Sequence, residues 1–133
     1  MKYMLDTNVC IDYMRGKNSA LFKRMNDCQL GDLCISSITL SELLYGVYRS
    51  SDHIHNRDVL NKLLVKVDVL DYDSLASEAY GPIRNDLMKR GCPIGPLDML
   101  IASHAKSKQM ILVTHNTSEF MRVRGLAVED WYI

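Results

Sequence analysis

The chain has 133 residues, and its 16 basic and 16 acidic side chains give a formal net charge of zero at pH 7. This length predicts one domain, residues 1–133, whose core can form without disulfides. Zero net charge excludes attraction of a polyanion by overall charge, so contact with nucleic acid must come from local patches. No apolar run reaches the roughly 18 residues of a membrane span, so no membrane role is expected. The four cysteines occur singly, without a C-x-x-C pair or a leader-like segment, which favours a cytoplasmic setting.

The first half of the chain predicts two strands and four helices from its apolar periodicity and its capping residues. In chain order these are a strand at 1–5, a helix capped by Thr7 or Asn8 and ended by Gly16, a helix opened by Ser19, a strand at 34–37, a helix at 39–47 and a helix at 52–66. Strands and helices therefore alternate from the start.

The second half continues this alternation. It predicts a strand at 67–72, a long helix from 73 or 74 to 90, a helix at 96–108, a strand at 110–114 and an edge strand at 126–128. Pro82 lies inside the long helix and is expected to kink or split it, because proline lacks an N–H donor and clashes with the preceding turn. Pro96 suits a first helical turn, and Trp131 is expected to cover part of the core.

Long helical connections between strands require parallel strand pairing. The fold class expected is therefore α/β, a three-layer αβα sandwich with a central, mainly parallel sheet. In such sheets ligands bind beyond the carboxyl ends of the strands, where neighbouring connections leave in opposite directions. Candidate functional residues should therefore be found just after strands.

Oxygen-bearing side chains occupy such positions. They are Asp6 with Thr7 after the first strand, Glu42 early in the helix after the second, Asp98 in a first helical turn, and Asn116 with Glu119 after the strand at 110–114. Hard divalent cations such as Mg²⁺ or Mn²⁺ prefer oxygen ligands, and without a cation such carboxylates repel one another. This pattern favours metal-dependent hydrolysis of a phosphate ester, with one or two ions.

Each acid also has a structural interpretation. Asp6 could cap the following helix, although Thr7 and Asn8 are available for that. Glu42 stands three residues after Thr39, the spacing of a capping box, and Asn116 and Glu119 repeat this spacing. Asp98 could simply stabilise a helix dipole. Only their convergence at one edge of the sheet would favour a shared site.

Histidines and basic residues are weaker candidates. His53 and His55 are expected at the surface, and His104 is expected in packing or at the surface, which leaves His115 as the one histidine near the predicted site. The basic residues that could contact phosphates are Arg15, Lys17, Lys89, Arg90, Arg122 and Arg124. Basic residues at helix ends are more often solvated complements to the helix dipole.

Four segments carry a family resemblance. They are Met-Leu-Asp-Thr-Asn at 4–8, the block at 36–46 from Ser36 to Gly46, Gly-Pro-Leu-Asp at 95–98, and Thr-His-Asn-Thr-Ser-Glu-Phe at 114–120, followed by Glu-Asp-Trp at 129–131. In this order, and from end to end, the chain resembles a PIN domain. More narrowly, it resembles the VapC toxins of bacterial toxin–antitoxin pairs.

The resemblance implies a Mg²⁺- or Mn²⁺-dependent endoribonuclease that inhibits translation. Asp6 and Asp98 would be the principal metal ligands and Glu42 the third acid, supported by Thr7. Many PIN domains have an aspartate where this chain has Asn116, and Glu119 would supply that acid instead. The implied substrate is transfer RNA, the initiator species included, with products that carry a 5′-phosphate and a 3′-hydroxyl.

The implied partners are a VapB-type antitoxin and a second copy of the chain, with operator DNA bound only through the antitoxin. Three alternatives remain open on the sequence. One is a PIN-like binding module that no longer cuts, which Asn116 would suggest, and another is an interaction protein without catalysis. The third is a haloacid-dehalogenase-like phosphatase, which the asparagine at position 8 disfavours.

Overall fold

The computed structural model describes residues 2–133, and in this range the chain forms one five-stranded sheet in the order β3-β2-β1-β4-β5. All four strand pairs are parallel. The strands are β1 (Tyr3–Leu5), β2 (Leu33–Ser36), β3 (Asp68–Leu70), β4 (Ile111–Val113) and β5 (Val128–Glu129). The predicted parallel α/β sheet is therefore confirmed, although the last strand lies one to two residues later than expected.

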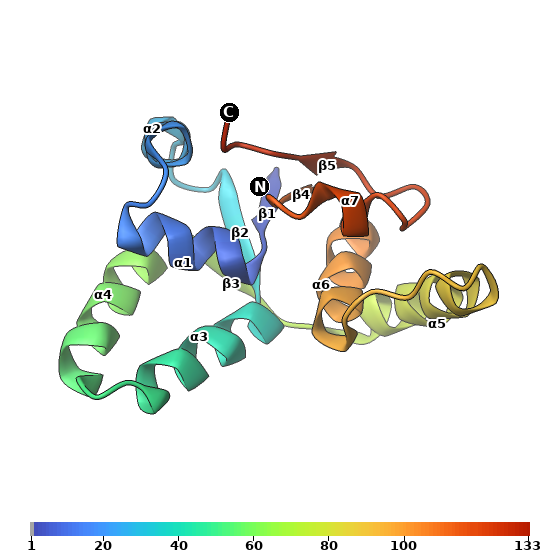
Figure 1. Ribbon diagram of the computed structural model, residues 1–133, viewed down its shortest axis with the longest axis horizontal. Helices are drawn as coiled ribbons and strands as arrows, with labels where there is room; N and C mark the ends of the chain where they lie inside the picture. The colour runs from blue at the N-terminus through green and yellow to red at the C-terminus, as the bar shows by residue number, and fades with distance from the viewer. Residues whose placement is uncertain (1) are drawn as a thin grey trace.

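Helices cover both faces of this sheet. They are α1 (Thr7–Arg15), α2 (Ser19–Asp27), α3 (Ser37–Arg49), α4 (His53–Lys66), α5 (Ser74–Lys89), α6 (Pro96–Ser107) and α7 (Thr117–Phe120). Helices α1 to α4 lie to one side of the strands and α5 to α7 to the other (Figure 1). The three-layer arrangement predicted from the sequence is confirmed.

The central strands separate two apolar cores. In β1, Leu5 packs with helices α1 to α4, whereas its neighbour Met4 packs with α5 and α6. In β4, Val113 and Leu112 divide in the same way. All four side chains are fully buried, so both faces of the sheet are covered, as parallel sheets require. Trp131 is also buried, as predicted, and its ring meets that of Tyr3 edge-on with centroids 4.9 Å apart.

Two helices begin earlier than the sequence suggested. Asp6, not Thr7 or Asn8, is the N-cap of α1, and its carboxylate accepts a hydrogen bond from the backbone N–H of Val9. Ser36 caps α3 by accepting from the N–H of Ile38, so this helix starts at Ser37. In both cases the strand's last residue, or the one after it, caps the helix directly, which removes the expected linker.

Helix α5 runs unbroken through Pro82, so the expectation that proline would split it is wrong. Pro82 is on the exposed side of the helix, where water can bond the carbonyl that proline leaves free. The residue before it is Gly81, which has no Cβ to clash with the proline ring. Ile83 and Leu87 are buried against the same core as α6 and hold the helix in place.

Successive strands are added to the sheet in opposite directions on the two sides of the β1–β4 junction. From β1 the connections lead outward to β2 and β3, and the chain then returns to place β4 on the other side of β1. The carboxyl ends of β1 and β4 are held together where the N–H of Asp6 donates to the carbonyl of Val113 at 3.1 Å. This junction is the position at which open parallel sheets bind ligands. None of the helices in residues 2–133 has the length and apolar character to cross a membrane.

Candidate active site

Asp6 is a buried carboxyl group at the end of β1, with only 4% of the residue exposed. Its Oδ1 accepts the capping hydrogen bond from Val9 N at 2.8 Å. Burial raises the pKa of this carboxyl group, and the charges of Asp12 and Glu42 raise it further, against hydrogen bonds that lower it. Each carboxylate oxygen has two lone-pair positions, so these hydrogen bonds still leave acceptor positions for a ligand. The structural and functional roles of Asp6 are therefore compatible.

Glu42 reaches the site from α3. Its Oε1 accepts a hydrogen bond from the Thr7 hydroxyl at 2.6 Å, which links α3 to the start of α1. The capping-box interpretation of Glu42 is wrong, since Thr39 lies inside α3 and not at its cap. Thr39 is fully buried, and its Oγ1 is 3.4 Å from that of Thr7.

Asp98 lies in the first turn of α6, where Pro96 is at the helix start as predicted. Burial raises its pKa to about 6, and the charges of Asp6, Glu119 and Glu42 add to the shift. The backbone at Gly95 approaches closely, because a Cβ built there would be 3.2 Å from Asp98 Oδ2. The charges of Asp6, Glu119 and Glu42 therefore act on Asp98.

Asn116 is the N-cap residue of α7, but its side chain contacts Glu119 and not the helix backbone. Asn116 Nδ2 donates to Glu119 Oε2 at 2.5 Å, and neither the expected capping box nor another side-chain cap forms at this helix. Thr114 is a site residue that the sequence reasoning missed. It is fully buried, a hydrogen bond from it lowers the pKa of Asp6, and its Oγ1 accepts from the N–H of Asn116 at 2.9 Å. The sequence analysis placed it at the end of the strand at 110–114, whereas β4 ends at Val113 and Thr114 is the first residue after it.

The donor set fits a hard divalent cation, because it consists of carboxylate, hydroxyl and amide oxygens. Burial is the main cause of the raised pKa of Asp98 and the neighbouring acids add to it, and a bound cation would offset the repulsion among these acids. Within residues 2–133, however, no three His, Cys, Asp or Glu side chains are close enough to bind one ion together. A cation would therefore have to draw the carboxylates inward.

A hollow of about 300 Å³ opens at the site and is lined by Asp6, Asn8, Asp12, His115, Asn116 and Tyr132. His115 therefore lies at the site, as predicted. His53 and His55 are exposed on α4, and His104 is buried with Nδ1 2.8 Å from Ser36 Oγ. These three positions agree with the surface and packing roles expected for them.

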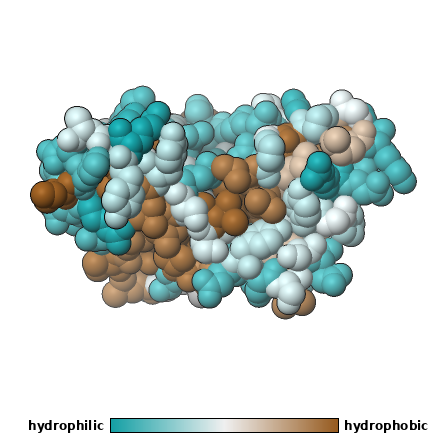
Figure 2. Space-filling model, turned by 90° about the horizontal axis from the view of Figure 1, so that it is seen from below, coloured by the Kyte–Doolittle hydropathy of each residue, from teal (hydrophilic) through white to brown (hydrophobic). Residues whose placement is uncertain are grey.

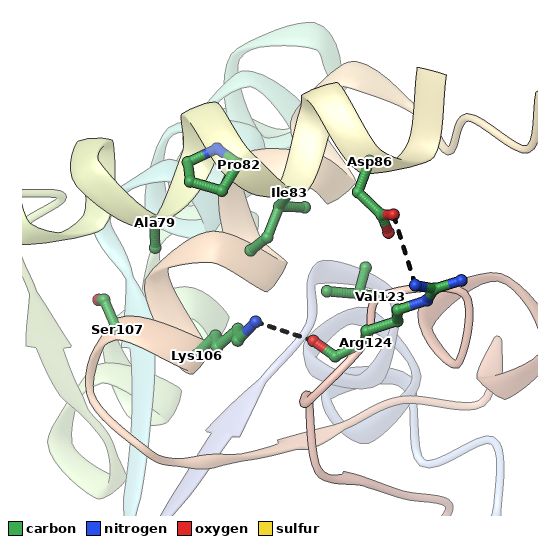
Figure 3. A pocket seen from close by; sticks show the side chains of 8 residues that line it. All are labelled: Ala79, Pro82, Ile83, Asp86, Lys106, Ser107, Val123 and Arg124. Atoms are coloured by element: carbon green, nitrogen blue, oxygen red, sulfur yellow. Dashed lines mark hydrogen bonds and ion pairs between the residues drawn. The ribbon is translucent and has the colours of Figure 1, made fainter. Parts of the chain in front are cut away.

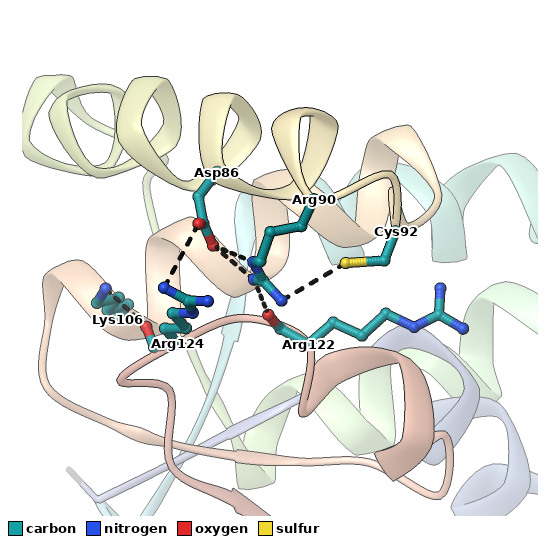
Figure 4. Close-up of polar contacts among 6 residues, drawn as sticks. All are labelled: Asp86, Arg90, Cys92, Lys106, Arg122 and Arg124. Atoms are coloured by element: carbon teal, nitrogen blue, oxygen red, sulfur yellow. Dashed lines mark hydrogen bonds and ion pairs between the residues drawn. The ribbon is translucent and has the colours of Figure 1, made fainter.

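Several basic side chains gather between α5 and the segment after α7 (Figure 4). Arg90 pairs with Asp86 and donates to the carbonyl of Arg122, while Arg122 donates to the carbonyl of Pro93. These contacts hold the segment before α6 against the segment after α7.

A second hollow, of about 440 Å³, lies beside this basic group (Figure 3). Lys106 and Arg124 line it, but Lys106 donates to the Arg124 carbonyl and Arg124 is 3.9 Å from Asp86. None of the four acids lines it. The hollow is therefore a surface groove beside the site and not part of the acidic centre.

The fold and the acidic site together define a class. The family model for the PIN domain matches residues 3–126, and the chain belongs to the PIN domain family. This assignment favours the nuclease interpretation over the phosphatase that the sequence left open.

Within this family the chain is similar to VapC ribonucleases. It is 47% identical to the tRNA(fMet)-specific endonuclease VapC of Shigella flexneri and 42% identical to that of Salmonella typhimurium, over 98% of each chain. Among solved structures, DNA-bound VapBC from Salmonella typhimurium matches with a TM-score of 0.93 at 42% identity, over 98% of both chains. VapBC2 from Rickettsia felis, bound to a promoter DNA fragment, matches with a TM-score of 0.89 at 34% identity, over 98% and 99%.

Proposed function

We propose that the protein is the toxin of a VapBC-type toxin–antitoxin pair, an endoribonuclease that uses Mg²⁺ or Mn²⁺. The observation that carries this proposal is the placement of acidic side chains beside the sheet's switch point, where Asp6 follows β1, Glu42 of α3 bonds Thr7, and Asp98 opens α6. The similarity to proteins named as VapC ribonucleases supports it over the full length of the chain.

Each site residue has a role in this proposal. Asp6 and Asp98 hold the cation, with Glu42 as the third acid, and Thr7 fixes the direction of Glu42 through its hydroxyl. A divalent cation, when bound, polarises the phosphodiester and lowers the pKa of the attacking water. Glu119, oriented by the Asn116 amide, accepts the proton of that water. Water, rather than a protein side chain or the ribose 2′-hydroxyl, attacks the phosphorus; the bond to the 3′ oxygen breaks and that oxygen takes a proton from solvent, so the products carry a 5′-phosphate and a 3′-hydroxyl.

Analysis of RNA ends tests this chemistry. RNA cut by the purified protein with Mg²⁺ should be a substrate for ligation at its new 5′ ends and should carry free 3′-hydroxyls. A 2′,3′-cyclic phosphate would mean that the ribose hydroxyl is the nucleophile and would contradict the mechanism. The metal choice is tested in parallel by restoring activity to EDTA-treated protein with Mg²⁺ or Mn²⁺ alone.

The proposed substrate is transfer RNA, with the initiator species first among those to be tested. Two relatives with 47% and 42% identity are named for this specificity. Incubation with total RNA, followed by mapping of new ends, gives the expected result of one dominant cut in initiator tRNA. Uniform degradation of all RNA would contradict the specificity.

The proposed partner is a VapB-type antitoxin. A groove of about 620 Å³ between α1, α3 and α4 is lined by apolar residues such as Ile11, Met14 and Val59, and also by Glu42. Seen from below, apolar surface extends over the part of the molecule where α3 and α4 lie (Figure 2). A partner in this groove would reach Glu42 and so inhibit the acidic site.

Oligomeric state and location complete the proposal. We infer a homodimer that uses the exposed apolar side chains of α3 and α4, Tyr45, Tyr48 and Ile54 among them. Because the chain has zero net charge, operator DNA is assigned to the antitoxin. The four cysteines are all unpaired, in keeping with the cytoplasm. Co-expression with a VapB-type antitoxin, followed by light scattering of the purified complex, tests the oligomeric state and the partner.

The alternative function is a PIN-like binding module without catalysis. Asp98→Asn distinguishes the two, because it removes a charge from the site and nothing from the proposed partner groove. We expect cell toxicity and RNA cleavage to disappear while antitoxin binding remains. A variant as toxic as the parent would favour the binding module.

A further inference from the structure

Two stacked rings lie beside the acidic site and take no part in the chemistry described above. The His115 imidazole and the Tyr132 ring have centroids 4.2 Å apart and planes inclined by 15°. Carboxylates hold both rings: His115 Nδ1 donates to Asp130 at 3.0 Å, and the Tyr132 hydroxyl donates to Asp12. The pair is therefore fixed in orientation before any ligand arrives.

One face of this pair is open. Tyr132 covers one face of the imidazole, yet 62% of the His115 side chain is exposed, so residues 2–133 leave the opposite face uncovered. Proteins that bind unpaired RNA stack its bases on rings of Phe, Tyr, Trp or His. A ring that is rigid on one side and open on the other is suited to this contact.

The two stacked rings lie at the same hollow as Asp6 of the acidic site. The hollow of about 300 Å³ is lined by both rings together with Asp6, Asn8 and Asn116. Its volume is at the lower end of the range for small-ligand sites. Asn8 is exposed, and its amide offers both a donor and an acceptor to the edge of a base. A base in this hollow would belong to a nucleotide close to the scissile phosphate, because Asp6, a proposed metal ligand, lines the same hollow.

We propose that His115 and Tyr132 form a stacking platform for one unpaired base of the RNA substrate, next to the scissile phosphate. This inference rests on the proposed ribonuclease function and deepens it by assigning a substrate-binding site. A base within a double helix is covered on both faces by its neighbours, so it cannot use the platform. The platform therefore directs cleavage to loops and other unpaired positions.

Binding of a labelled RNA tests the platform. The probe is fluorescein-labelled initiator tRNA, and all variants carry Asp98→Asn so that the RNA stays intact. His115→Ala should weaken binding by at least about fivefold, the lower end of the effect of removing one base–ring stack. His115→Phe keeps a flat ring without nitrogens and should bind within about twofold of the parent, as should Tyr132→Phe.

A matched control is His53→Ala. His53 is also an exposed imidazole packed against a tyrosine, Tyr48, but it is on α4 and does not line the hollow. Its removal should leave RNA binding unchanged. Melting temperatures of all variants should agree with the parent within about 3 °C, because His115 is exposed and its loss removes little buried surface.

Cleavage kinetics with active protein separate stacking from proton transfer. Stacking predicts that His115→Ala raises KM while kcat changes less and the pH profile stays the same. If His115→Phe is as impaired as His115→Ala, the ring nitrogens matter and the platform is wrong. If the parent cleaves RNA and His115→Ala binds it equally well, the inference fails alone. If the parent neither binds nor cleaves RNA, the proposed function fails and the platform with it.

Discussion

The Thr7 hydroxyl donates a hydrogen bond to the Glu42 carboxylate across 2.6 Å and so joins the first turn of α1 to α3 at the acidic site. Residues 35 positions apart are brought together by this contact. The same bond fixes the orientation of the Glu42 carboxylate. Its removal is therefore an informative test of the site.

Replacing Thr7 with valine should reduce kcat, because Glu42 loses the donor that orients it. Hydrogen bonds to charged groups contribute about 1.5–3 kcal/mol, which corresponds to a loss of about tenfold or more. Thr7→Ser keeps the hydroxyl and should retain activity within about threefold. Initial rates on RNA measure both, and equal rates for Thr7→Val and the parent would show that Glu42 needs no orientation.

Asp98 should make metal-free stability depend on pH. Its pKa in the folded protein is raised from 3.8 to about 6, so the folded state holds this proton more tightly than the unfolded chain. The stabilisation is present below pH 3.8 and is lost as pH rises from about 4 to about 6. In EDTA at pH 8, Asp98→Asn should therefore melt at a higher temperature than the parent, as measured by calorimetry.

Millimolar Mg²⁺ or Mn²⁺ should reverse that order. A cation that binds only the folded protein raises the melting temperature, and it needs ionised carboxylates. The parent should therefore gain stability with Mg²⁺ at pH 8, less so at pH 5, while Asp98→Asn gains little at either pH. A parental melting curve that Mg²⁺ and Mn²⁺ leave unchanged would count against the metal site.

Gly95→Ala should impair activity without unfolding the protein. The added Cβ would stand 3.2 Å from Asp98 Oδ2, while the backbone at Gly95 has a φ of −55°, which alanine adopts readily. We expect kcat to fall by about tenfold through displacement of the carboxylate, an effect typical of small misplacements in active sites. Gly46→Ala in α3, where an added Cβ meets nothing within 4 Å, is the control and should keep full activity.

His104 should destabilise the protein in mild acid. Burial lowers the pKa of its imidazole, so the unfolded chain binds this proton more readily than the folded one. Stability should be complete above pH 6.5 and should fall as pH drops below it. His104→Leu removes the titration and loses the contact with Ser36, so it should cost about 1 kcal/mol at pH 7.5 but flatten the decline. Urea unfolding at pH 5 and 7.5 measures both effects.

Capping residues show where sequence reasoning reached its limit. A first strand, the stop at Gly16 and the alternation of strands and helices follow from local periodicity and turn chemistry, and the structure confirms them, with the strand at Tyr3–Leu5 and residue 1 of the predicted range outside the described residues. Whether Asp6 or Thr7 caps α1, and whether Glu42 bonds its own helix or Thr7, depends on which elements lie opposite. Spacing along the chain carries no information on contacts between elements. The predictions that Thr7 caps α1 and that Thr39 caps α3 were therefore wrong.

Pro82 shows the same limit in packing. Proline disfavours a helix locally, but burial of Ile83 and Leu87 against the core shared with α6 outweighs it. The sequence by itself determined the parallel α/β fold and the residues that supply acidic oxygens, because both follow from side-chain type and position along the chain. Only the tertiary structure decided that the charges of Asp6, Glu42 and Glu119 act on Asp98 and help to raise its pKa. These residues are distant in sequence, and they come near one another because the chain returns to place β4 beside β1.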